Sequence, residues 1–139
     1  MSPTGFSPYF ENAAVRLLAH PNGIVLFQYR PGQRCFTDLK AVFKQLGDLL
    51  QQRGWRTILT DQRELAPFSE QESAWITEFW TAYFAQHGGS ILGAVIASPN
   101  VFARLASSSL WHNNRRLPIA YTIFAEQETA VAWLLAQVA

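Results

Sequence analysis

The chain has 139 residues, of which 49% are hydrophobic, 15% are charged and 14% are aromatic. This length is typical of one domain, and the apolar content is far above that of disordered chains. Eleven basic and ten acidic residues leave a formal net charge of +1, so no strong positive field attracts nucleic acid or an anionic membrane. We therefore expect one folded domain that does not bind nucleic acid.

Cysteine content and hydropathy indicate in which cellular compartment the protein is expected. The only cysteine, Cys35, cannot form an intramolecular disulfide or a multi-cysteine zinc site, which is typical of a reducing compartment. Residues 1–12 lack the pattern of a signal peptide, and no apolar run reaches the roughly 18 residues of a membrane span. His20, His87 and His112 have no metal-ligand spacing. We expect a cytoplasmic protein without a membrane span, a metal or another cofactor.

The N-terminal part is predicted to contain an arm and a hairpin. Prolines and glycines interrupt residues 1–12, which indicates an irregular arm before a single domain over 13–139. Residues 15–19 and 24–29 are apolar and rich in β-branched side chains. Because Asn22-Gly23 between them favours the positive φ angles of a tight turn, we expect an antiparallel hairpin.

A helix and a short strand are expected next. Apolar residues at three- and four-residue spacing predict an amphipathic helix over residues 36–51. Thr37 is the predicted cap of this helix, and Gly54 suits a left-handed stop. Residues 57–60 then form a β-prone run that ends at Asp61.

The following helix is unusually rich in aromatic residues. Ser69 and Glu72 have the spacing of a capping box, and Gly88-Gly89 marks the end of the helix. Its large apolar side chains form two neighbouring rows: Trp75, Phe79 and Tyr83 in one, and Ile76, Trp80 and Phe84 in the other. Six such side chains exceed what one narrow stripe requires, so they indicate core packing, a partner surface or an apolar ligand pocket.

The last third of the chain alternates strands with helices. Residues 91–97 form a continuous apolar run that predicts a strand covered on both faces, and Ser98-Pro99 predicts the start of a helix that ends near residue 109. After the polar stretch 112–116, we expect a strand over 119–124 and a helix over 126–137. The order ββαβαβαβα predicts an α/β fold with a single mixed β-sheet, in which right-handed crossovers follow the N-terminal hairpin.

Two segments resemble the SpoIIAA-like (STAS) superfamily. They are Trp55–Asp61 after the first long helix and the closing Phe124-Ala125-Glu126, which is followed by Ala130 and Trp133-Leu134. More narrowly, residues 13–137 are similar to the bacterial STAS/SEC14-type proteins. The resemblance implies a small sheet wrapped by helices and, in the best-known branch, a regulatory role as an antagonist of anti-sigma factors.

That branch carries a phosphorylatable serine in an Asp-Ser-Ser-Gly setting after a central strand. Here residues 62–68 separate Asp61 from Ser69, so the motif is absent as written, and Ser69 is expected to be a helix cap or a modified residue. Asp61, Arg63 and Glu64 follow a parallel strand, at the edge where open α/β sheets bind ligands. The alternative is that these three residues stabilise the turn through salt bridges.

Arg115 and Arg116 lie in the most concentrated basic stretch of the chain. Two arginines could bind a carboxylate or phosphate, although a solvated loop is the simpler interpretation. Because no known catalytic motif is present, the first hypothesis is a non-enzymatic regulatory or interaction module with a protein partner or a second copy. The second is a carrier or sensor of a small apolar or lipid-like ligand. The third is a small enzyme that uses Asp61 or Glu64 with these arginines.

Overall fold

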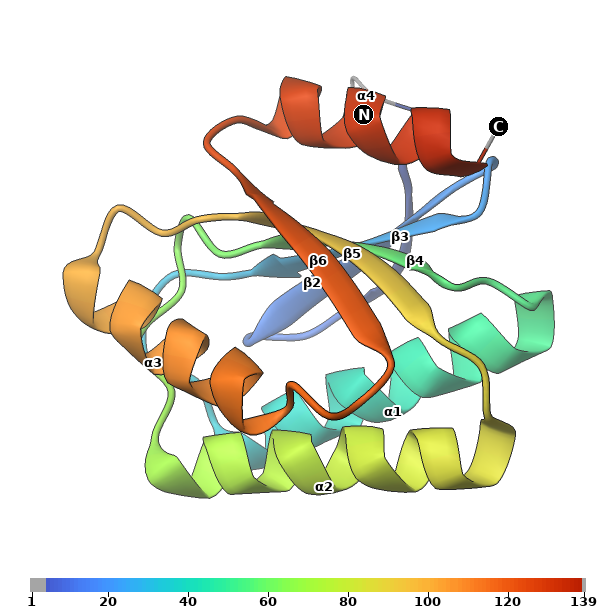
Figure 1. The fold of residues 1–139 in the computed structure, drawn as a ribbon. Helices are drawn as coiled ribbons and strands as arrows, with labels where there is room; N and C mark the ends of the chain where they lie inside the picture. The colour runs from blue at the N-terminus through green and yellow to red at the C-terminus, as the bar shows by residue number, and fades with distance from the viewer. Residues whose placement is uncertain (1–4, 139) are drawn as a thin grey trace.

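The computed structural model describes residues 5–138, which form an α/β fold around one mixed β-sheet (Figure 1). In chain order the elements are β1 (Ser7–Glu11), β2 (Val15–His20), β3 (Ile24–Tyr29), α1 (Phe36–Arg53), β4 (Thr57–Asp61), α2 (Glu70–His87), β5 (Ile91–Ile96), α3 (Val101–Asn113), β6 (Ile119–Phe124) and α4 (Gln127–Val138). The order of strands in the sheet is β1-β2-β3-β4-β5-β6. The predicted fold class is therefore confirmed, with one more strand at the N-terminal side.

The sheet combines an antiparallel half with a parallel half. β1, β2 and β3 pair antiparallel, and β3 to β6 pair parallel. The predicted hairpin is the β2–β3 pair, whose turn holds Gly23 at a φ of 93°. The prediction of an irregular arm is wrong for residues 7–11, which form β1. An edge strand tolerates Pro8 and a bulge, and the β1 register shifts between Pro8 and Phe10. Residues 1–4 of the predicted arm lie outside the described residues.

The helices cover the two faces of the sheet unequally. Right-handed crossovers between neighbouring strands all return over the same face. Accordingly, α1, α2 and α3 lie together on one face, and α4, which follows the last strand, lies on the other (Figure 1). Within residues 5–138 no strand follows β6, and α4 packs on the face that the crossovers leave open.

Two hydrophobic cores result, one on each face of the sheet. Alternate residues of β3 supply both: Val25 and Phe27 pack with α1, α2 and α3, while Leu26 packs with Ala130 and Leu134 of α4. β5 is also buried on both faces, as its continuous apolar sequence predicts. None of the described helices is long and apolar enough to cross a membrane.

Helix boundaries follow hydrogen bonds that the sequence signals only partly identify. Gly54 ends α1 in the left-handed conformation, as predicted, but Cys35 rather than Thr37 is the residue before the first turn. The predicted cap Ser98 is also wrong, because its Oγ accepts from the Asn100 N–H and the Asn100 side chain caps α3 instead. α3 continues past residue 109 because Leu110 lies on its buried face.

Candidate functional site

Asp61 lies at the carboxyl end of β4 and is 3% exposed. Its Oδ1 accepts from the backbone N–H and Nε of Arg63 at 3.1 and 3.0 Å, and its Oδ2 accepts from Arg63 Nη2 at 2.7 Å and Gln28 Nε2 at 3.1 Å. Burial alone raises the pKa of Asp61, but the hydrogen bonds from Arg63 and Gln28 outweigh it, and the pKa lies below its usual value. The carboxylate is therefore held ionised, which suits a structural ion pair better than a proton acceptor.

A shallow polar hollow beside Asp61 is lined by three arginines, and each of them has a carboxylate partner. Arg16 and Arg30 pair with Glu11, and Arg63 pairs with Asp61. The exposed Glu64 also lines the hollow. The sequence prediction that Asp61, Arg63 and Glu64 gather at this edge agrees with their position. The geometry of Asp61 and Arg63 matches the salt-bridge alternative, because these two side chains pair with each other, whereas Arg16 and Arg30 share the one carboxylate of Glu11.

Arg115 and Arg116 lie at the opposite end of the sheet. Both are exposed and precede β6, whose first residue, Ile119, pairs with Ile91, whereas Asp61 pairs with Ile96 at the far end of β5. A strand of this length spans about 17–20 Å. The structure therefore does not bring Asp61 or Glu64 together with the two arginines, and the enzyme constellation expected from the sequence is not formed.

Ser69 has the capping role that its sequence predicts. Its Oγ accepts from the Glu72 N–H at 3.0 Å, and its own N–H donates to Glu72 Oε1 at 2.8 Å. Glu72 also forms a two-bond ion pair with Arg34, in which both N–O distances are 2.8 Å. Arg34 further donates to the carbonyl oxygens of Ala66 and Pro67. Sequence reasoning missed this pair, because nothing local connects residues so far apart in the chain.

The aromatic side chains of α2 belong to the core. Trp80 is 4% and Tyr83 9% exposed, and Trp75 is half-buried. The ring of Phe43 on α1 lies 5.6 Å from that of Trp75 and 6.4 Å from that of Trp80. The Tyr83 hydroxyl oxygen accepts from Gln51 of α1 at 2.7 Å. Of the three alternatives for these side chains, the positions of Trp75, Trp80 and Tyr83 agree with core packing and not with an exposed partner surface, because α1 covers this face of α2.

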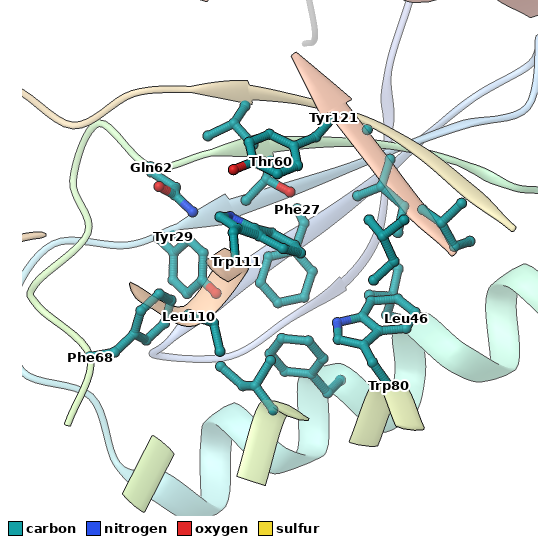
Figure 2. Close-up of a pocket in the computed structure, with 17 residues that line it drawn as sticks. Phe27, Tyr29, Leu46, Thr60, Gln62, Phe68, Trp80, Leu110, Trp111 and Tyr121 are labelled. Atoms are coloured by element: carbon teal, nitrogen blue, oxygen red, sulfur yellow. The ribbon is translucent and has the colours of Figure 1, made fainter. Parts of the chain in front are cut away.

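An apolar cleft lies between the sheet and the helices α1, α2 and α3 (Figure 2). Trp80, Trp111 and Tyr121 are among the aromatic residues that line it, and the rings of Trp111 and Tyr121 lie 5.0 Å apart. The Trp111 Nε1–H is buried and has no hydrogen-bond partner among residues 5–138. The cavity measures about 50 Å³, which is room for a few water molecules and is about a third of the volume of roughly 150 Å³ in an engineered apolar cavity that binds benzene.

Large exposed hydrophobic residues lie on α3 and β6, and one of them, Tyr121, also lines the cleft. We call them the α3–β6 surface; in the described part of the chain they are Val101, Phe102, Leu105, Tyr121 and Ile123. Phe102 is 70% exposed, Leu105 60% and Ile123 58%. Sequence reasoning placed these residues on a helix and a strand but could not show that no further element covers them.

β6 is the last strand of the sheet and has β5 as its neighbour on one side. Among the described residues, none pairs with its other side. Residues 120–123 are all exposed. The α3–β6 surface therefore combines apolar side chains with an open strand edge, and both features are typical of protein interaction sites.

Comparison with known proteins supports the fold and does not identify a function. No family model and no curated protein matches the chain. An NMR structure of the protein TM1081 has a similar fold, with a TM-score of 0.57 and 12% sequence identity. The similarity covers 94% of this chain and 90% of that one.

Proposed function

We propose that the chain is a non-enzymatic protein-interaction module of the STAS type that associates with a second copy through the α3–β6 surface. The observation that carries this proposal is that the large hydrophobic residues exposed within residues 5–138 all lie on α3 or on the edge strand β6. The residues that resemble the family support it at the level of packing: Ala130 and Leu134 are fully buried, and the rings of Phe124 and Trp133 lie 5.6 Å apart.

Burial of the α3–β6 surface would release a free energy of the same order as the cost of association. Fully burying one large apolar side chain contributes about 1.5–3 kcal/mol, and the five side chains of each copy are about half exposed. The gross contribution of both copies is on the order of 10 kcal/mol, which is comparable with the association cost of about 4–15 kcal/mol. The net charge of +1 adds little repulsion between copies.

The geometry gives the other hypotheses less support. A carrier of a lipid-like molecule needs a far larger cavity than the cleft beside Trp80 provides. The ion-paired carboxylate of Asp61 and its distance from Arg115 disfavour an enzyme. We place the module in the cytoplasm, because Cys35 is a free and exposed thiol.

Sedimentation equilibrium tests the self-association directly. We expect the wild-type protein to have twice the monomer mass of 15.7 kDa at concentrations above about 10 µM. Phe102→Glu should weaken the dimer by about 100-fold, because it places a charge in an apolar contact. Ala132→Glu, an exposed position on α4, is the matched control and should leave the dimer intact. A wild-type monomer at all concentrations, or equal effects of both substitutions, would contradict the proposal.

A further inference from the structure

The two edges of the sheet differ in how well they resist pairing with another strand. The β1 edge has Pro8 within the strand, a shift in register after it, and the charged Glu11 at its end. Each of these features discourages strand addition. β6, in contrast, pairs with β5 in unbroken register from Ile119 to Phe124, and residues 117–125 carry no charge. The β6 edge is therefore the unprotected one.

The hydrogen bonds at the two ends of β6 show which of its backbone groups point away from β5. The Ile91 N–H donates to Pro118 O at 2.9 Å, and the Ala97 N–H donates to Phe124 O at 3.1 Å. Because successive residues of a strand turn their backbone groups to opposite sides, the odd-numbered residues of β6 face the open side. The Ile119 N–H already donates to Leu117 O at 2.7 Å. Complete donor and acceptor pairs thus remain at Tyr121 and Ile123.

We propose that β6 pairs antiparallel with β6 of a second copy, with the two Thr122 residues facing each other on a two-fold axis. The inference rests on the proposed self-association and specifies its geometry. In this register Tyr121 of each copy exchanges backbone hydrogen bonds with Ile123 of the other, so the donor and acceptor pairs of both residues are satisfied. A register centred on Tyr121 would instead require the Ile119 N–H, which is occupied.

The side chains fit the same register. On the α3 face, the Tyr121 ring lies beside Ile123 of the second copy, and on the α4 face Thr122 meets its symmetry mate. Aromatic with β-branched pairs and Thr with Thr pairs are both favourable across antiparallel strands. Tyr121 also contacts Trp111 of α3, with ring centroids 5.0 Å apart, so α3 lies on the Tyr121 face of the new strand pair.

The arrangement ends at two copies. An isologous contact uses the same surface on both molecules, so it leaves no further β6 edge for a third copy. The outer edges of the joined sheet are then the two β1 strands, which Pro8 and the bulge protect. A closed dimer, not a fibre, is the expected product.

Disulfide cross-linking tests this register. Facing residues of a non-hydrogen-bonded antiparallel pair have Cα atoms about 4.5 Å apart, within the range of a disulfide. With Cys35→Ser removing the native thiol, Thr122→Cys should form a covalent dimer under mild oxidation. Tyr121→Cys should not, because diagonal neighbours are about 7–8 Å apart. Adding Phe102→Glu to Thr122→Cys should slow cross-linking by about 10-fold or more.

The outcomes separate the register from the proposed function. A wild-type dimer that is sensitive to Phe102→Glu but shows no Thr122→Cys disulfide would overturn the strand pairing and leave the self-association intact. Efficient cross-linking through Tyr121→Cys would also overturn this register. A wild-type monomer would overturn both proposals. Hydrogen exchange needs no substitution: the Tyr121 and Ile123 amides should exchange about 10-fold more slowly in the dimer than in dilute monomer, and equal rates would count against the pairing.

Discussion

Asp61 contributes to stability through a charge that the fold keeps ionised. Its pKa in the folded state lies below the unfolded value of about 3.9. The ionised carboxylate therefore stabilises the fold above about pH 4, and this contribution is lost as the pH falls through the lower folded-state pKa. We expect Asp61→Asn to lower the free energy of unfolding by about 1–3 kcal/mol at neutral pH and by less near pH 3.

Urea denaturation across this pH range measures the effect of Asp61→Asn. Glu64→Gln is the matched control, because that carboxylate is exposed, and it should change the free energy of unfolding by less than about 0.5 kcal/mol. An Asp61→Asn loss that stays constant from neutral pH to about pH 3 would show that the charge is not responsible.

Residue positions along the sheet edge were predictable, but their partners were only partly so. Asp61 and Arg63 are two residues apart, so the turn that joins them is visible in the sequence. Gln28, the other hydrogen-bond partner of Asp61, comes from β3 and is 33 residues away. Only the parallel register of β3 and β4, which sets Gln28 beside Asp61, brings these side chains together.

At the scale of elements, the Arg34–Glu72 ion pair joins the β3–α1 loop to the first turn of α2. Arg34 lies between β3 and α1, and Glu72 is the third residue of α2, which begins at Glu70. Both side chains are at least nine-tenths buried. We expect Arg34→Met alone to destabilise the fold by about 3–5 kcal/mol, because it leaves the Glu72 charge buried without its partner. The double variant Arg34→Met/Glu72→Leu should lose less than the sum of the two single variants.

A double-mutant cycle with guanidinium denaturation gives the coupling energy of Arg34 and Glu72. We expect a coupling of about 1–3 kcal/mol. Additive effects would mean that the two side chains act independently, for example through packing of Arg34 against the Phe68 ring 5.1 Å away.

Helix and strand boundaries were predictable where a short sequence motif determines them. They were less predictable where several nearby residues could take the same role. The capping box of α2 needs only Ser69 and Glu72, and it is present as predicted. The start of α3 shifted because Ser98 and Asn100 both offer a capping oxygen and Ser98 is used within the preceding turn. The sequence did not predict β1. This strand pairs only with β2, and its residues are exposed or half-buried, so its sequence lacks the apolar run of a buried strand.

For the molecule as a whole, self-association links thermal stability to protein concentration. A dimer whose interface forms only between folded chains gains stability by mass action. We expect the melting temperature of the wild-type protein to rise by about 3–5 °C when its concentration increases about 100-fold. Differential scanning calorimetry measures this shift. Phe102→Glu should show no such dependence, and a concentration-independent wild-type melting temperature would argue for a monomer.

The overall architecture followed from the sequence, while the candidate surface did not. Alternating strand and helix patterns with short connections determine an α/β sheet. Whether the aromatic rows of α2 face the core or solvent depends on α1, whose Phe43 meets the Trp75 ring across a distance of 32 residues in the chain. In the sequence, Phe102 and Ile123 look like ordinary core residues. Their exposure becomes apparent only in the structure, where β6 is the edge strand of the sheet.

Strands that neighbour each other in the sheet are also consecutive in the chain. Each strand therefore pairs with the strand that comes before it and the strand that comes after it in the chain. Among the described residues β6 has no strand after it in the sheet, so the proposed contact with a second copy would continue the same order of neighbouring strands across two molecules.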